Sequence, residues 1–265
     1  MSELKNIVIE REGSLGKIVL NRPEVKNALD RVMATELLHG LDTHLEDPAV
    51  RSIAILAKGD AFCAGGDLSQ MKKLSSSSGN KAYDWSEAIV AANKRMLTAE
   101  KPVIAAVNGA AMAGGMGLVG MCDIVVATKK AKFAMPEVQI GLFPMIIVAH
   151  LSRSLPRKRL LEMMMTGWPM TAEEAHGLGF VNRLADSEAD LINIVKDYSE
   201  RFEKVSPNAV ALGRRAFTLL ADMPASQALD AAQFFNVPFF FGDDLREGAD
   251  AFLERRQPRW KGLKT

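Results

Sequence analysis

The sequence predicts an α/β fold whose last third is helical. Two observations predict it. Apolar strand-like segments alternate with amphipathic helical segments through the first part of the chain, and from Arg157 onward the periodic segments have helical spacing. With 265 residues, 48% apolar and 25% charged, the chain has a globular composition and the length to bury a large core. Its net charge of +1 gives no overall attraction for nucleic acid or anionic membranes, so neither is an expected partner.

Short apolar runs bounded by turn residues mark the predicted strands. They are Ile7–Ile9, Lys17–Leu20, Ser52–Leu56, Pro102–Val107 and Asp123–Thr128. The first two are joined by Glu12–Gly16, which indicates a hairpin. Because Pro102–Val107 is apolar on both of its faces, we expect it to lie in a sheet that is covered on both sides.

The predicted helices have apolar residues three or four positions apart and recognisable ends. Asp30 is a typical N-cap for the first helix, which Asp47-Pro48 stops. The others are Ser86–Thr98, Arg157–Met165, Ala172–Leu178, Glu188–Glu203 and Pro207–Ala221. Between Leu68 and Trp85, the serine run 75–78 predicts a flexible surface loop, which is either a plain connection or a gate over a site.

Residue types that bind metals are scattered along the chain. Cys63 and Cys122 lack metal-ligand spacing and the four histidines lie in separate segments, so no metal site is predicted. Two cysteines also suit a reducing compartment. Met1–Arg11 is charged and lacks a signal-peptide core, and glycines and polar residues interrupt the apolar region 103–128. We therefore expect a cytoplasmic protein that does not span a membrane.

Glycines cluster at the ends of two predicted strands. One cluster is Gly59–Leu68 and the other is Asn108–Leu118. Glycine allows the backbone to approach a ligand closely, and unpaired amides at the start of a helix attract a carbonyl oxygen or an anion. Two such turns can direct two N–H groups at one oxygen atom, although tight packing of a helix on a strand would also require glycines.

A different function is suggested by the segment Gly115–Gly120, which matches the dinucleotide-binding pattern GxGxxG. The context argues against this interpretation. Residues 108–113 separate the glycines from the preceding strand, and the next strand ends in Thr128 and two lysines instead of an acid. A nucleotide-dependent oxidoreductase therefore stays as a minor alternative.

Six motifs, taken in chain order, resemble those of the enoyl-CoA hydratase/isomerase family, also called the crotonase family. They are Leu20–Leu29, Phe62–Leu68, Val107–Asp123, Pro136–Pro144, Gly167–Leu178 and Glu247–Arg256. The resemblance covers nearly the whole chain. It implies a ββα spiral core over residues 1–200, carrying the CoA and thioester site, and a helical C-terminal region over 201–265 that is used to form trimers.

The resemblance also implies an acyl-CoA substrate and the roles of individual residues. The thioester oxygen would be held by the backbone amides of Gly66 and Gly114, where donors stabilise an enolate as its charge develops, and Glu137 would be the catalytic acid/base. No tightly bound cofactor is implied, because coenzyme A is part of the substrate. The residues expected to contact the CoA thioester are Lys26, Ala28, Ala64, Asp67, Leu68, Gly117 and Met145.

The chain departs from the two-carboxylate hydratases of that family. Gly117 stands where they have a second glutamate, and an apolar segment begins at Met145 where they have glycines. One carboxylate can take and return a proton, so double-bond isomerisation is slightly favoured over hydration by Glu137 and a bound water. Gly117 is expected to leave room for substrate or water, and the apolar segment to raise the pKa of Glu137. A non-catalytic acyl-CoA binder is the third alternative.

Aromatic residues gather near the C-terminus. Phe234-Phe235 and Phe239–Phe241 flank Val237-Pro238. Such a cluster is either an intrachain core or an interface. The resemblance favours an interface in a homotrimer or a dimer of trimers.

Overall fold

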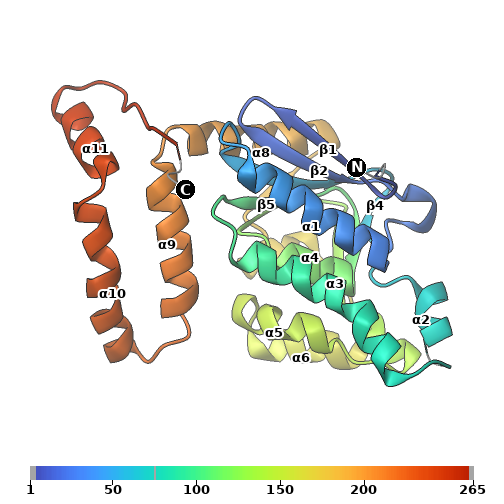
Figure 1. The fold of residues 1–265 in the computed structure, drawn as a ribbon. Coiled ribbons are helices and arrows are strands. Elements are labelled where there is room, and N and C mark those ends of the chain that lie inside the picture. The colour runs from blue at the N-terminus through green and yellow to red at the C-terminus, as the bar shows by residue number, and fades with distance from the viewer. Residues whose placement is uncertain (1–3, 75, 263–265) are drawn as a thin grey trace.

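The computed structural model describes residues 4–74 and 76–262 (Figure 1). Met1 to Glu3 of the N-terminal segment and Ser75 of the serine run lie outside the described residues. The strands are β1 (Ile7–Glu12), β2 (Leu15–Leu20), β3 (Ser52–Ala57), β4 (Ala61–Cys63), β5 (Val103–Val107), β6 (Ala110–Met112), β7 (Ile124–Thr128), β8 (Lys132–Ala134), β9 (Met170–Thr171) and β10 (Arg183–Ala185).

The helices follow the predicted order with one addition before residue 98, two between residues 98 and 157, and two after residue 221. They are α1 (Arg31–Glu46), α2 (Leu68–Leu74), α3 (Gly79–Leu97), α4 (Gly114–Gly120), α5 (Met145–Ser154), α6 (Arg157–Thr166), α7 (Ala172–Gly177), α8 (Glu188–Glu203), α9 (Pro207–Leu220), α10 (Ala225–Phe240) and α11 (Asp243–Leu253), with 3₁₀ turns η1 (Pro23–Val25) and η2 (Pro136–Ile140).

Two sheets alternate along the chain. The larger has the strand order β1-β2-β3-β5-β7-β10 and is parallel apart from the β1–β2 hairpin. The smaller has the order β4-β6-β8-β9. Three times the chain passes from the larger sheet to the smaller and then into helical structure, through β3–β4, β5–β6 and β7–β8. The expected α/β fold with a ββα spiral is confirmed.

Both faces of the larger sheet are covered, as the apolar pattern of β5 predicts. Val103, Ala105 and Val107 belong to the main core, while Ile104 and Ala106 pack with residues of α8 on the opposite face. All five residues of β5 are buried. The core therefore lies on either side of this sheet, and the loops at the strand ends are free to form a site.

The loop predicted at the serine run is confirmed at residues 76–78, and the segments on either side of it, between Leu68 and Trp85, are helical. Leu68–Leu74 forms α2, and α3 begins at Gly79 and contains Trp85. Ala92 and Met96 bury one face of α3, and this helix packs along α1. Residues 79–84 at its start are exposed and continue the helix beyond the buried part, which leaves only a short connection between α2 and α3.

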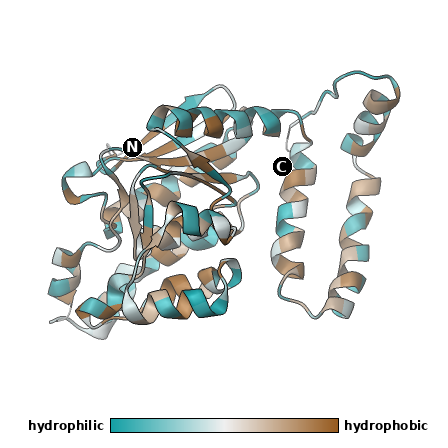
Figure 2. Cartoon of the chain, turned by 180° about the vertical axis from the view of Figure 1, so that it is seen from behind, coloured by the Kyte–Doolittle hydropathy of each residue, from teal (hydrophilic) through white to brown (hydrophobic). Residues whose placement is uncertain are grey.

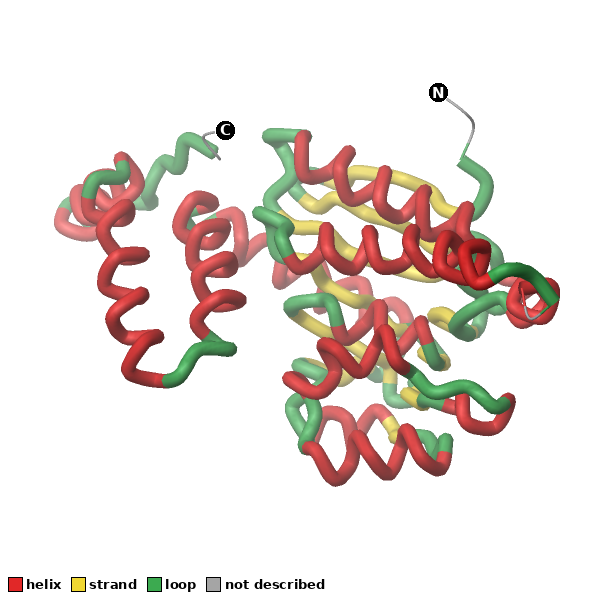
Figure 3. The backbone as a smooth tube through the Cα atoms, turned by 60° about the horizontal axis from the view of Figure 1, so that its bottom comes forward, coloured by secondary structure: helices red, strands yellow, loops and turns green. Residues whose placement is uncertain are grey.

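The last three helices extend away from the spiral (Figure 1), with α9 and α10 running side by side (Figure 3). Much of α10 has the brown colour of hydrophobic residues in Figure 2. Phe234, Phe240 and Phe241 are 77%, 67% and 85% exposed, so the aromatic cluster is not an intrachain core. The domain boundary at residue 200 stays a prediction. In the part of the chain that the structure describes, no helix is long and apolar enough to cross a membrane.

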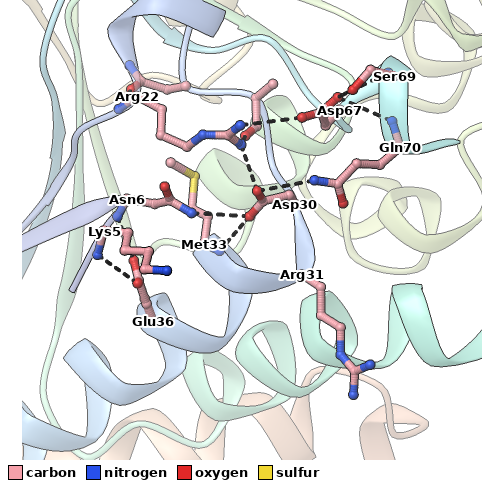
Figure 4. A network of polar contacts seen from close by, with 12 residues as sticks. Lys5, Asn6, Arg22, Asp30, Arg31, Met33, Glu36, Asp67, Ser69 and Gln70 are labelled. Carbon is pink, nitrogen blue, oxygen red and sulfur yellow. Dashed lines mark hydrogen bonds and ion pairs between the residues drawn. The ribbon is translucent and has the colours of Figure 1, made fainter. Parts of the chain in front are cut away.

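One partly buried ion network fastens the loops that precede α1 and α2 (Figure 4). Arg22 Nη1 lies 3.0 Å from Asp30 Oδ2, and Arg22 Nη2 lies 3.4 Å from Asp67 Oδ2. Asp30 caps α1 by accepting from the Met33 amide at 2.7 Å, as its position predicts. Hydrogen bonds, first from the Ser69 hydroxyl, lower the pKa of Asp67. The three side chains are 16%, 8% and 13% exposed, so solvent screens them little.

We expect Arg22→Met to lower the free energy of unfolding by about 3 kcal/mol, because two poorly solvated carboxylates lose their cation. Arg153→Met is the matched control, since Arg153 pairs with Asp222 where both side chains are more than half exposed. That variant should cost less than about 1 kcal/mol. Urea denaturation measures both values, and equal losses would show that the Arg22 network does not hold these loops.

Candidate active site

A cavity of about 440 Å³ lies where the loop after β4, the start of α4, η2 and the start of α5 meet. Helices α2 and α3 also contribute to its wall. The lining residues are Leu29, Ala64, Gly66, Leu68, Met71, Trp85, Ile89, Ala113, Gly114, Pro136, Glu137, Gln139, Ile140, Leu142, Phe143, Pro144, Met145, Ile146 and Ile147. Most of these side chains are apolar, which is typical of a ligand pocket with a few polar groups.

The Gly66 amide is held with its N–H free by a short backbone pairing. The Leu29 N–H donates to Gly65 O at 2.6 Å, and the Asp67 N–H donates to Leu29 O at 2.9 Å. These two bonds make a parallel bridge between Leu29 and Gly66. In such a bridge the Gly66 N–H faces away from Leu29. It has no acceptor within the described part of the chain.

Gly114 supplies a second free amide beside the first. It is the first residue of α4, where a backbone N–H has no intrahelical acceptor. A Cβ atom added at Gly114 would lie 3.9 Å from the Gly66 nitrogen, and one added at Gly65 would lie 3.3 Å from the Gly114 nitrogen. The structure thus brings Gly66 and Gly114 together at the cavity, as the glycine clusters predict.

Backbone strain accompanies this approach of the two loops. Ala113, directly before Gly114, has φ of 50° and ψ of −123°, a conformation that alanine rarely adopts. Its N–H donates to Ala134 O at 2.8 Å, which ties the turn to β8. Gly65 has φ of 93°, and a side chain there would collide with Ala113. Strain of this kind is common where a turn is held in place for function.

Glu137 lies in the 3₁₀ turn η2 and is half-buried at the cavity wall. Its Oε2 atom is buried and has no hydrogen-bond partner among the described residues. Burial raises the pKa of Glu137, in the direction expected from the apolar segment that follows it. A carboxyl group with a raised pKa and one oxygen without a partner is suited to exchanging a proton with a ligand.

The expectation that Gly117 leaves room for substrate or water is wrong. A Cβ atom added at Gly117 would lie 2.2 Å from Ile147 Cγ2, so the side chain of Ile147 from α5 fills this space. Gly117 is buried and does not line the cavity. The Nε2–H of His150 donates to Gly117 O at 2.9 Å, and burial lowers the pKa of this histidine. No second carboxylate lines the cavity among the described residues.

The glycines of the GxGxxG segment serve packing. Gly115 and Gly120 lie inside α4. Added Cβ atoms would lie 2.4 Å from Cys63 O and 2.4 Å from Leu151 Cδ2 respectively. These contacts press α4 against β4 and α5. The segment is therefore not the phosphate-binding turn that a dinucleotide site requires.

The other expected substrate-binding residues divide into two groups. Ala64, Leu68 and Met145 line the cavity. Lys26, Ala28 and Asp67 do not line it. The Asp67 carboxylate is occupied by Arg22 and by the Ser69 hydroxyl, the latter at 2.6 Å, and Ala28 O accepts from Arg22 Nη1 at 2.9 Å.

Lys26 is exposed in a left-handed turn with φ of 53°, outside the cavity. Among the described residues, no group of three or more His, Cys, Asp or Glu side chains could hold a metal ion.

The residues of α3 that line the cavity were not predicted for the site. Trp85, Ile89, Ala92 and Met96 follow helical spacing, and this periodicity extends the helix predicted at 86–98 back to Trp85. It would have placed Trp85 on the face that packs inward. No local signal identifies Ile147 as the residue that fills the space at Gly117, because the contact joins segments thirty residues apart.

The chain is similar to known proteins along nearly its whole length. The family model described as enoyl-CoA hydratase/isomerase matches residues 10–263. A protein named putative enoyl-CoA hydratase from Thermus thermophilus is 33% identical over 94% of this chain and 98% of its own length. A Xenopus laevis protein named enoyl-CoA hydratase domain-containing protein 3, mitochondrial, is 34% identical over 96% of this chain and 85% of its own length.

Solved structures agree with the sequence relatives. The crystal structure of an enoyl-CoA hydratase from Mycobacterium smegmatis has a TM-score of 0.90 at 32% identity and covers 97% of this chain and 99% of its own. The crystal structure named for an enoyl-CoA hydratase subunit I from Geobacillus kaustophilus has a TM-score of 0.90 at 34% identity and covers 99% of this chain and 100% of its own. The chain therefore belongs to the enoyl-CoA hydratase/isomerase family of enzymes, which act on acyl-CoA thioesters.

Proposed function

We propose that this chain moves the double bond of an enoyl-CoA with Glu137 as its single acid/base. The observation that carries the proposal is the half-buried Glu137, whose Oε2 atom has no partner among the described residues, in a cavity where Ile147 closes the space at Gly117. A second carboxylate or a water held at Gly117 would need this same space. Hydration must activate a water and also deliver a proton to C2, tasks that two carboxylates can share, whereas double-bond migration needs only one acid/base group.

The steps use two backbone amides and one side chain. The thioester oxygen of a 3-enoyl-CoA accepts hydrogen bonds from the N–H groups of Gly66 and Gly114. Glu137 removes a proton from C2, and the negative charge of the resulting dienolate develops on that oxygen, where the two donors stabilise it. The protonated Glu137 then returns the proton to C4, which gives the 2-enoyl-CoA. A raised pKa suits a group that must both accept and donate within one turnover.

Hydration of a 2-enoyl-CoA is the second candidate, because several relatives are named enoyl-CoA hydratases. In this alternative Glu137 activates a water molecule elsewhere in the cavity. To separate the two candidate functions, the rates of isomerisation and hydration are measured on one enzyme sample with a small panel of enoyl-CoA chain lengths. The ratio of the two rates shows which reaction the enzyme catalyses. Turnover of either kind excludes the non-catalytic acyl-CoA binder.

The CoA portion and the assembly also belong to the proposal. Lys26 is a cation at the surface of the loop after β2 and would meet the CoA phosphates, and Ala28 and Asp67 would support that loop. No tightly bound cofactor is proposed, and a cytoplasmic location stays a prediction. The exposed aromatic residues of α10 would be covered by other copies of the chain in a homotrimer or a dimer of trimers.

Glu137→Gln should lower kcat/KM for 3-enoyl-CoA isomerisation by about a hundredfold or more, since the amide cannot take the proton. Absorbance of the conjugated thioester product measures it, with Glu173→Gln, an exposed residue of α7, as the control. The wild-type rate should rise with pH around a midpoint above the ordinary glutamate value of about 4.3, because the base form is required. A folded Glu137→Gln variant with normal turnover would refute the assignment.

Gly114→Ala should lower kcat by about a hundredfold while the protein stays folded. The added methyl group would lie 3.9 Å from the Gly66 nitrogen, where the thioester oxygen must sit, and 3.2 Å from a flexible Leu29 methyl group. Gly177→Ala is the control, because a Cβ there meets open space. Steady-state kinetics together with thermal melts distinguish a loss of catalysis from a loss of folding. A fully active Gly114→Ala variant would show that the thioester carbonyl binds elsewhere.

Light scattering at micromolar concentration should give three times the mass of one chain, or six times for a dimer of trimers. The physical reason is the exposed apolar surface of α10, which costs free energy in water. A stable monomer at that concentration would contradict the proposed assembly.

A further inference from the structure

The side chain of Ile147 lies between the cavity and the second turn of α4. Ile147 lines the cavity together with Glu137 and Gly114. Its Cγ2 atom lies 2.2 Å, and its Cβ atom 3.0 Å, from the position that a Cβ at Gly117 would take. Gly117 follows Gly114 by three residues in α4, so both lie on one side of this helix. A side chain at position 117 would therefore need the volume that Ile147 occupies at the cavity wall.

The position of Ile147 is fixed by the packing of α5 on α4. Ile147 is 4% exposed and belongs to the main core. His150, three residues further along α5, donates through Nε2–H to Gly117 O at 2.9 Å, and its Cε1 atom lies 3.8 Å from the same Cβ position at Gly117. A buried side chain held on two sides makes room for added atoms only by repacking its surroundings.

The backbone of Gly117 offers no free polar group to a water molecule. Its N–H donates to Ala113 O at 3.0 Å. Its carbonyl oxygen accepts from the Met121 N–H at 3.1 Å and from His150. A buried water needs space and two or more polar partners, and the place in front of Gly117 holds a methyl group of Ile147 instead. This part of the wall therefore provides neither an acid nor a bound water.

We infer that Ile147 is a specificity-determining residue that favours double-bond migration over hydration, because it keeps a second acid/base group and water away from the substrate at Gly117. The inference rests on the proposed function in placing the double bond in this cavity. Ile147 transfers no proton itself. The inference therefore concerns how the ratio of the two reactions changes when Ile147 is truncated, whichever reaction is faster in the wild-type protein.

The test measures hydration of a 2-enoyl-CoA and isomerisation of a 3-enoyl-CoA on the same protein samples. Gly117→Glu alone should leave the ratio of hydration to isomerisation near its wild-type value, because Ile147 obstructs the new carboxylate. Gly117→Glu combined with Ile147→Ala should raise the ratio about tenfold or more, since a well-placed acid/base group contributes at least that much. Ile147→Gly in place of Ile147→Ala also removes the Cβ atom at 3.0 Å and gives the carboxylate more room.

Leu151→Ala is the matched control. Leu151 is a fully buried residue of the same helix, and its Cδ2 atom lies 2.4 Å from the position of a Cβ at Gly120, but it does not line the cavity. Gly117→Glu combined with Leu151→Ala should keep the ratio of Gly117→Glu alone. This control separates the opening of the Gly117 space from a general loosening of the contact between α4 and α5.

A second measurement needs no turnover. Gly117→Ala should lower the melting temperature of the wild-type protein, and it should lower that of Ile147→Ala by less than half as much, because the added methyl group then avoids the Cγ2 contact. A Gly117→Ala variant that melts like the wild-type protein overturns the inference without any change at Ile147.

Two kinetic outcomes also overturn the inference: a ratio that Gly117→Glu alone raises as much as the double variant does, and a ratio that stays at the wild-type value in the folded double variants. The proposed function fails separately. If the wild-type protein hydrates faster than it isomerises, and truncation of Ile147 with Gly117→Glu still raises the ratio, the proposed isomerisation is wrong and the role of Ile147 stands.

Discussion

The two backbone hydrogen bonds of Leu29, one to Gly65 and one from Asp67, fix the position on which the rest of the site depends. They use the carbonyl and amide on either side of Gly66 and leave its own N–H free for a ligand. The Arg22 network secures this pairing from outside by joining the N-cap of α1 to Asp67. Because Gly114 begins α4 beside Gly66, a shift of either loop would separate the two amides that the proposed mechanism directs at one oxygen.

The chemistry proposed for the cavity depends on one carboxyl group in its wall and on the lack of a second one among the described lining residues. Glu137 is the acid on its wall, and burial raises the pKa of this group. Ile147 fills the space beside Gly117, so the second loop contributes an amide through Gly114 and no side-chain acid. One carboxyl group and two free backbone amides in the same cavity are the groups that the proposed mechanism needs to form an enolate and reprotonate it at another carbon.

The sequence predicted those parts of the fold and site that depend on local conformation. Asp30 marks the start of α1, and the pattern of β5 marks a sheet buried on both faces, because capping and burial leave periodic signals. The two glycine clusters drew attention because glycine allows close backbone approach, and the family resemblance selected Gly66 and Gly114 within them; their role at the thioester stays a prediction. The filling of the Gly117 space was not predicted, since Ile147 comes from another helix. Trp85 was not predicted for the site, because the helix was expected to begin at Ser86 whereas α3 begins at Gly79.

Exchange of the C2 hydrogens of a saturated acyl-CoA in deuterated water tests the central claim most directly, because it requires enolate formation and nothing else. Mass spectrometry of butyryl-CoA measures this exchange. Because the acyl chain has no double bond, the result is independent of whether the enzyme isomerises or hydrates its substrate. With Glu137 as the base and the Gly66 and Gly114 amides as donors, wild-type protein should incorporate deuterium at C2 and Glu137→Gln should not exceed the buffer rate. Exchange at the wild-type rate in Glu137→Gln would contradict the account.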